Sequence, residues 1–257
     1  MGLQLPATPW RLPDPADAPA GDDLFCIGGD LEPATLLNGY ARGMFAMHVD
    51  VQDAPAELLI DQTSRRVGRD QELFDLAGSA AIGWWSPDPR GVLIPTAVHE
   101  SRSLRGHRNR FTVTFDQAFA EVVRRCAAAN RDGGWITGAF RDAYQRLHEA
   151  GWAHSVEVWN ADDHSQLVGG LFGIELGGLF CAESKFSTVT DASKTAVVAL
   201  ARFLSADDGY ERLIDTQWWT PHLGRLGASQ VPRERYLSQL PRITALPPRF
   251  GQPSSTV

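Results

Sequence analysis

Three polar side chains stand inside apolar, strand-like runs in the second half of the chain, and they are its first candidates for chemistry. Glu183 interrupts the run LFCAESKFS, and Asp215 follows two aliphatic residues in LIDTQ, which ends with Gln217. A carboxylate in an apolar strand is costly to bury unless another group pairs with it. These residues are therefore candidates for a site rather than a core, with proton transfer or amine binding as the chemistry.

The strand period groups these residues further. Side chains alternate between the two faces of a strand, so Asp215 and Gln217 are expected on one face of their strand. Glu183 and Lys185 are likewise expected to share a face of theirs. If the two strands lie near each other, a carboxylate pair, an amide and an ammonium group meet in one cleft. The alternative is an exposed strand face that carries ordinary polar residues.

The composition is that of an ordinary globular protein. The 257 residues fit one large domain or one domain with a smaller companion, and 43% apolar and 21% charged residues are typical of soluble proteins. No stretch approaches the roughly 18 apolar residues of a membrane span, and the N-terminus does not read as a secretory signal. Three cysteines without CxxC spacing argue against a disulfide scaffold or a zinc site and favour a reducing cytoplasm.

The net charge of −7 argues against a nucleic-acid partner, but the distribution of charge weakens that argument. Segment 101–110 contains no acidic residue and carries four arginines, which are Arg102, Arg105, Arg108 and Arg110. A local basic patch on an acidic protein binds a phosphate backbone in a salt-sensitive way. The alternative is a solvated basic surface.

Periodicity predicts a mixed α/β protein in which strands and helices combine with short hairpins. Helices are expected at 32–43, after Asp116 as its N-cap, at 138–150 and from about 191 to 204. Strands are expected at 111–115, 154–159, 166–176, 178–187 and 213–217, with Gly177-Gly178 as a hairpin turn. The expected division is a small N-terminal domain at 1–82 with an irregular leader and an insertion or loop at 48–82, a main domain at 83–245 and a flexible tail at 246–257.

Several words of the sequence occur in the order found in one known family. They are GGDLEPATLLNGYARGMF at 28–45, WWSPDPRGVLIP at 84–95, HSVEVW at 154–159, LVGGLFGIELGGLFCAESKFS at 167–187 and LIDTQ at 213–217. Through them, residues 24–240 resemble the bacterial leucyl/phenylalanyl-tRNA–protein transferases. The resemblance implies an acetyltransferase-like (GNAT-type) C-terminal domain behind a smaller α+β N-terminal domain.

The same resemblance implies an activity. The family moves an aminoacyl group, expected to be Leu, Phe or Met, from the 3′ end of aminoacyl-tRNA to an acceptor protein. The acceptor's N-terminal amine receives the group, the acceptor begins with Arg or Lys, and the product is marked for degradation. Chemically this is aminolysis of an ester, in which an amine loses a proton, an oxyanion is stabilised and a ribose hydroxyl leaves. No metal and no organic cofactor are expected, and a cytoplasmic monomer is favoured.

The resemblance also implies roles for individual residues. Asp215 matches the catalytic aspartate, Gln217 orients the reacting groups, and Glu183 holds the α-amino group of the aminoacyl moiety. The reverse assignment, with Glu183 as the base and Asp215 as the anchor, stays open. Trp135 matches the aromatic residue on which the terminal adenine stacks, and the four arginines are candidates for tRNA phosphates. The aminoacyl pocket is expected to include Phe180, Lys185, Ile214 and Thr195.

The chain departs from the family pattern at two places. Phe45-Ala46-Met47 stands for the usual Phe-Pro-Trp, and Lys185 stands for a methionine that helps to line the pocket. Lys185 has three interpretations: it pairs with Glu183 or Asp215, it selects a polar or acidic aminoacyl group, or it extends into solvent without a role.

Two other functions compete with aminoacyl transfer. An acyl-CoA N-acyltransferase on the same fold needs a glycine-rich pyrophosphate turn, and GRLGAS at 224–229 lacks its spacing. An inactive tRNA- or peptide-binding module is mildly favoured by the loss of Pro-Trp at 46–47. The presence of Asp215, Gln217 and Glu183 counts against that module.

Overall fold

Two β-sheets organise the chain, which the computed structural model describes over residues 5–18, 21–49, 81–129, 134–205 and 209–251. Within these residues a small antiparallel sheet has the order β1-β3-β2, formed by Leu24–Ile27, Ala81–Trp85 and Phe45–Val49. The large sheet has the order β10-β4-β9-β8-β7-β6-β5. Its strands are β4 (Arg90–Leu93), β5 (Phe111–Phe115), β6 (Ala153–Asn160), β7 (Leu167–Leu176), β8 (Leu179–Ser187), β9 (Leu213–Gln217) and β10 (Ser229–Val231).

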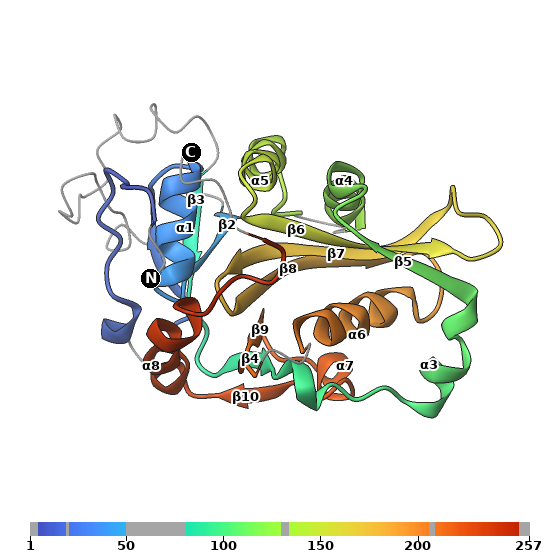
Figure 1. Cartoon of the computed structure of the whole chain (residues 1–257). Coiled ribbons are helices and arrows are strands. Elements are labelled where there is room, and N and C mark those ends of the chain that lie inside the picture. The colour runs from blue at the N-terminus through green and yellow to red at the C-terminus, as the bar shows by residue number, and fades with distance from the viewer. Residues whose placement is uncertain (1–4, 19–20, 50–80, 130–133, 206–208, 252–257) are drawn as a thin grey trace.

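Helices cover both faces of the large sheet. The helices of the described chain are α1 (Pro33–Ala41), α3 (Arg102–Gly106), α4 (Phe119–Ala129), α5 (Gly138–Glu149), α6 (Ala192–Leu204), α7 (Pro221–Gly224) and α8 (Arg233–Thr244). Helices α4 and α5 pack on one face and α6 packs on the other, so the sheet separates two apolar clusters (Figure 1). The interior strand β7 is buried along its whole length, as expected for a strand with a packed layer on each side.

The order of the strands brings Glu183, Asp215 and Gln217 together at one position in the large sheet. Strands β5 to β8 form an antiparallel series, and α6 then returns the chain so that β9 runs parallel to β8. The paired register of β8 and β9 ends at Cys181 and Asp215. Glu183 and Gln217 lie just beyond this point, where the two strands separate.

Short turns set the ends of these elements. The hairpin between β7 and β8 uses Gly177 with a φ of +61°, a backbone conformation that favours glycine. A β-carbon at Gly177 would lie 2.3 Å from the carbonyl oxygen of Thr244, so α8 also leaves no room for a side chain there. Gly151, with a φ of +79°, follows the end of α5. The predicted hairpin turn and the predicted end of this helix are both confirmed.

Most predicted elements are confirmed to within about two residues, and the mixed α/β class is confirmed with them. Strand β3 begins at Ala81 and joins the small sheet, so the predicted domain division at residue 82 falls inside a strand. The predicted insertion at 48–82 lies outside the described residues except at its two ends, which belong to β2 and β3. Within the described chain, no helix has the length and apolar character needed to cross a bilayer.

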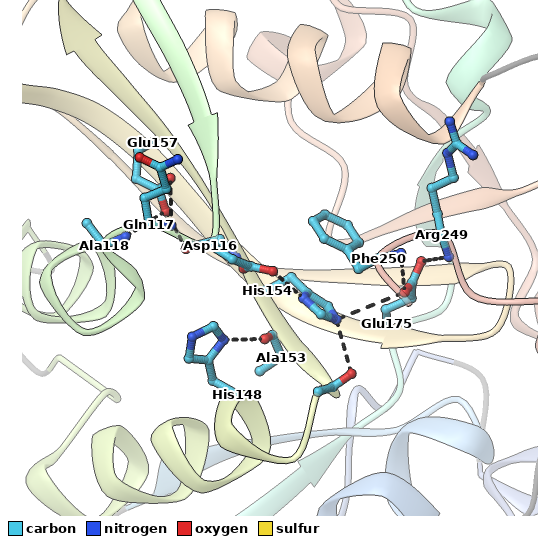
Figure 2. Close-up of polar contacts among 12 residues, drawn as sticks. Asp116, Gln117, Ala118, His148, Ala153, His154, Glu157, Glu175, Arg249 and Phe250 are labelled. Atoms are coloured by element: carbon cyan, nitrogen blue, oxygen red, sulfur yellow. Dashed lines mark hydrogen bonds and ion pairs between the residues drawn. The ribbon is translucent and has the colours of Figure 1, made fainter. Parts of the chain in front are cut away.

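Asp116 does not cap α4, contrary to the sequence prediction. It has a φ of +56°, and its Oδ1 accepts the N–H of Ser155 in β6 at 2.8 Å. The N–H groups of Gln117 and Ala118 instead point to the carboxylate of Glu157, at 3.3 and 3.4 Å (Figure 2). The residue that accepts these N–H groups before the helix therefore comes from β6, roughly forty residues away in the sequence.

The segment that follows α8 packs on the large sheet. Glu175 of β7 accepts the N–H of Arg249 at 2.6 Å and that of Phe250 at 3.0 Å, and the Phe250 ring stacks on His154 with centroids 4.1 Å apart (Figure 2). Burial raises the pKa of Glu175, and the two N–H donors oppose that rise. The prediction of a flexible tail from residue 246 does not describe this part of it, while residues 252–257 lie outside the described residues.

Candidate active site

A β-bulge in β8 positions Glu183. Phe172 of β7 pairs with Ser184, and the next residue, Gly173, pairs with Ala182, so Glu183 is the extra residue on β8. The bulge breaks the strict alternation of faces. Glu183 turns to the face covered by α5, whereas Lys185, opposite Leu171, turns to the face covered by α6. The predicted shared face of Glu183 and Lys185 is therefore wrong.

Glu183 is buried, 7% exposed, and both of its oxygens accept hydrogen bonds. Tyr144 of α5 donates its hydroxyl to Oε2 at 2.8 Å, and Gln217 donates its side-chain amide to Oε1 at 3.1 Å. Burial raises the pKa of Glu183 to about 8, although hydrogen bonds from Tyr144 and Tyr40 oppose the rise. A carboxyl group with such a pKa exchanges a proton readily near neutral pH.

Asp215 has a different environment, because its carboxylate is fully buried and fully engaged. Arg90 of β4 donates from Nε to Oδ1 at 2.8 Å and from Nη2 to Oδ2 at 2.5 Å. Tyr236 of α8 donates its hydroxyl to Oδ2, and the backbone N–H of Gln217 donates to Oδ1. Burial of Arg90 acts to lower its pKa, but the charges of Asp215, Tyr236 and Cys181 and the hydrogen bonds to Asp215 together outweigh it, so the pKa is raised. Both oxygens of Asp215 are thus already occupied by donors from the protein.

Gln217 connects the two carboxylates. Its backbone N–H donates to Asp215 at 2.9 Å and its side-chain amide donates to Glu183. Its φ of +60° is unusual for a residue other than glycine, so the surrounding contacts hold a conformation that the free chain rarely adopts. The side chain is 7% exposed. Asp215 and Arg90 therefore fix the backbone that aims Gln217 at Glu183.

A cavity of about 100 Å³ opens beside Glu183, between β8, β9, α6 and α7. Its apolar wall consists of Leu171, Ala182, Val197, Leu200, Ile214 and Leu223. Its polar side consists of Glu183, Ser184, Lys185, Thr216 and Gln217. The cavity is thus an apolar pocket with a titratable carboxyl group at one side, which suits a small apolar group attached to a reacting polar centre.

The structure places only part of the predicted aminoacyl pocket at this cavity. Lys185 and Ile214 line it. Phe180 is buried on the α6 face and packs against Phe250, with centroids 5.9 Å apart. Thr195 of α6 donates its hydroxyl to the backbone carbonyl of Asp191. Neither Phe180 nor Thr195 is among the residues that line the cavity.

Trp135 lies near the site through an aromatic contact. Its ring meets Phe140 and Tyr144 edge to face, with centroids 5.6 and 6.2 Å away. Tyr144 is the donor to Glu183, so the indole lies one side chain away from the carboxyl group. Trp135 is half-buried and packs against the apolar cluster on the α5 side of the sheet.

The four predicted phosphate-binding arginines differ in their environments. Arg105 and Arg108 both pair with the buried carboxylate of Glu100, which Arg202 of α6 also contacts at 2.6 Å. The hydrogen bond from Arg108 is the main cause that lowers the pKa of Glu100. Arg110 lies over the ring of Phe111 at 6.0 Å. Arg102 is exposed and has no ion pair among the described residues.

Sequence reasoning assigned no role to Arg90, Tyr144, Tyr40 and Tyr236, which surround the two carboxylates. Arg90 lies in the motif WWSPDPRGVLIP, which is part of the family resemblance. A single sequence nevertheless cannot show that Arg90 is buried against Asp215. Among the described residues, no three His, Cys, Asp or Glu side chains form a cluster suited to a metal ion.

Comparisons with known proteins find the same family that the sequence motifs resemble. A sequence model of the family described as leucyl/phenylalanyl-tRNA protein transferase matches residues 92–241. Proteins named leucyl/phenylalanyl-tRNA–protein transferase from Edwardsiella ictaluri and Oleidesulfovibrio alaskensis are 40% and 43% identical. Each alignment covers 98% of this chain and 90% or 92% of the relative. A solved structure of L-PGS from Bacillus licheniformis is 11% identical over 53% of this chain and 48% of that chain, and its TM-score of 0.36 supports no fold assignment. On the strength of the sequence matches, this chain belongs to the leucyl/phenylalanyl-tRNA protein transferase family.

Proposed function

We propose that this chain transfers an aminoacyl group from the 3′ end of a tRNA to the N-terminal amine of a protein. The observation that carries the proposal is Glu183, a carboxyl group with a pKa of about 8 at the side of an apolar cavity. An ordinary N-terminal amine has a pKa of about 8. A proton therefore passes between that amine and Glu183 at little cost in free energy.

The cavity and its surroundings provide sites for the donor. The apolar wall fits the side chain of a leucyl, phenylalanyl or methionyl group, and burial of that side chain holds the ester beside Glu183. Trp135 offers a ring on which the terminal adenine stacks, a contact worth about 1–3 kcal/mol per base. The basic segment 101–110 contributes contacts with tRNA phosphates, chiefly through its exposed arginines.

The reaction then follows as proton transfer and substitution. The acceptor ammonium gives one proton to the ionised Glu183, and the free amine attacks the carbonyl carbon of the ester. A C–N bond forms, the C–O3′ bond breaks, and Glu183 returns its proton to the departing O3′. The nitrogen loses its remaining extra proton to water. In this scheme Gln217 positions Glu183, and Asp215 with Arg90 holds Gln217, so Glu183 takes the proton-transfer role first expected of Asp215.

Further expectations follow from the family. We propose that the acceptors begin with Arg or Lys, that the modified proteins are degraded, and that the reaction takes place in the cytoplasm. A protein with a net charge of −7 attracts a cationic N-terminus. An acetyltransferase-like fold for the large sheet is supported by the antiparallel series β5–β8, the α6 crossover and the parallel strand β9.

The acyl-CoA alternative gains no support from the segment GRLGAS. A pyrophosphate is held where backbone N–H groups open a helix. Residues 224–229 instead leave the end of α7 and enter β10. No described feature of this segment favours a coenzyme.

The test is a transfer assay read by mass spectrometry. Purified protein is mixed with all charged tRNAs and reporter peptides that begin with Arg, Lys or Ala. A mass gain of one aminoacyl residue on the Arg and Lys peptides alone supports the proposal. Acyl-CoA replaces the tRNAs in a parallel reaction, and transfer from it alone would support the alternative enzyme. Retention of tRNA without any product would indicate a binding module and refute catalysis.

A further inference from the structure

Lys185 brings a positive charge to the apolar cavity. It lies on β8 opposite Leu171, on the face covered by α6, and it lines the cavity with Ile214 and Val197. The side chain as a whole is exposed, yet desolvation by the surrounding protein lowers the pKa of Lys185, with only the Cys126 thiol opposing. Lys185 thus lines the cavity while its side chain keeps contact with solvent.

This charge has no partner among the described residues. No hydrogen bond or ion pair joins Lys185 to another described side chain. The carboxylate of Glu183 faces α5 and is engaged by Tyr144 and Gln217. Asp191, at the start of α6, pairs with Lys194 at 2.7 Å and with His107 at 2.9 Å, so it too is occupied.

Neighbouring residues show the sign of the local field. The pKa of His222, in α7, is lowered first by burial and then by the charges of Lys185, Lys194 and Arg225. Three cations thus act on one histidine beside the cavity that Leu223 lines. On the α7 side of the cavity a bound group therefore lies near positive charge, which favours an anionic end on its side chain.

We propose that Lys185 extends the donor range of this pocket to aminoacyl groups whose side chain ends in a carboxylate, of the glutamyl class. The inference rests on the proposed transfer reaction. The methylene groups of such a side chain contact the apolar wall, and its carboxylate pairs with the Lys185 ammonium through a charge-assisted hydrogen bond. An apolar side chain fills the same wall but leaves the ammonium without a partner and partly stripped of water.

The experiment uses one tRNA body charged in turn with glutamate, glutamine and leucine, so that only the aminoacyl group differs. The full-length protein is compared with Lys185→Met, and Lys194→Met is the matched control. Lys194 is a nearby lysine that pairs with Asp191 and does not line the cavity. Initial rates of transfer to one peptide give the glutamyl-to-leucyl and glutamyl-to-glutaminyl ratios for each protein.

The expected result is a fall in the glutamyl-to-leucyl ratio of about 10- to 100-fold in Lys185→Met, as the loss of one hydrogen bond to a charged group implies. The ratio in Lys194→Met stays at the value of the unaltered protein. Glutaminyl transfer, which lacks the charge, is slower than glutamyl transfer only when Lys185 is present. If Lys185→Met fails to fold, Lys185→Gln takes its place.

Two failures are distinguishable. Efficient leucyl transfer with the same ratios in all proteins would overturn the role of Lys185 and leave the proposed reaction intact. No product from any donor would overturn the proposed reaction itself, and this inference with it.

Discussion

The guanidinium of Arg90 and the carboxylate of Asp215 form a buried bidentate salt bridge, with N–O distances of 2.8 and 2.5 Å. Their side chains are 1% and 0% exposed. Arg90 also donates to the carbonyl of Gly43 at 3.0 Å, between α1 and β2. The pair therefore connects the strand that carries Gln217 to the small sheet.

Removing one partner of this pair leaves a buried charge without compensation. Asp215→Ala is expected to lower the free energy of unfolding by about 3–5 kcal/mol. Asp215→Asn keeps the shape and some hydrogen bonds, so it costs less. Urea unfolding measures both, and Glu211→Ala is the control, because its pair with Arg242 is exposed and worth about 1 kcal/mol or less. If Asp215→Ala unfolds at the same urea concentration as the unaltered protein, the pair does not stabilise the folded state.

The rate of transfer is expected to rise with pH because Glu183 acts in its ionised form. With a pKa of about 8, the carboxyl group is largely protonated below that pH and ionised above it. The rate at low substrate concentration should therefore climb as pH approaches about 8 and fall at higher pH, where the acceptor ammonium loses the proton that it gives to Glu183, and Glu183→Gln should lose both the rate and the rising limb. A flat profile in the unaltered protein, with full loss of activity in Glu183→Gln, would indicate a binding role instead of proton transfer.

Stability is expected to change with pH in the opposite direction. The pKa of Glu183 is raised from 4.5 in the unfolded chain to about 8 in the folded protein. Between these values the unfolded state has released the proton and the folded state retains it, so the free energy of unfolding falls as pH rises. Urea titrations across this window measure the slope. In Glu183→Gln the slope should be smaller, and an identical slope in both proteins would contradict the shift.

Gln217 allows a test that separates backbone from side chain. Gln217→Ala and Gln217→Gly both remove the amide that donates to Glu183, so both should slow transfer. Glycine accepts a φ of +60° without strain, so Gln217→Gly should be the more stable variant, by about 1–2 kcal/mol. Thermal or urea unfolding compares the two. Equal stability would mean that the backbone relaxes to another conformation in these variants.

The arginines of segment 101–110 should contribute unequally to tRNA binding. Arg102 is exposed and has no ion pair among the described residues, whereas Arg108 already pairs with Glu100. Arg102→Ala should weaken binding and reduce the slope of log affinity against log salt by about one. Arg108→Ala should reduce that slope less. Filter binding at several salt concentrations measures both slopes. A larger reduction in Arg108→Ala than in Arg102→Ala would indicate that Arg108 contacts the phosphate.

Regular elements could be predicted because their signals are local. The alternation in 111–115 and the apolar period of α5 depend only on neighbouring residues, and both elements lie where the sequence places them. Asp116 was misassigned because its partner Ser155 and the acceptor that replaces it, Glu157, both lie in β6. A pattern of types along the chain carries no information about such distant contacts.

The sequence predicts which residues form the site, but it does not predict how they are arranged. Glu183, Asp215 and Gln217 stand out as polar residues in apolar strands, and the structure brings all three together. The bulge that separates Glu183 from Lys185 inserts one residue, and a period of two in the sequence cannot reveal an insertion. The engagement of Asp215 by Arg90 depends on the pairing of β4 with β9, more than one hundred residues apart.

The contact between Glu175 and the N–H groups of Arg249 and Phe250 has a consequence for the order of assembly during synthesis. Phe250 stacks among His154, Phe203 and Phe115, and it is synthesised after all three. Until it emerges from the ribosome, this aromatic layer lacks one ring and Glu175 lacks two donors. The large sheet therefore completes this part of its interior only after synthesis has passed Phe250.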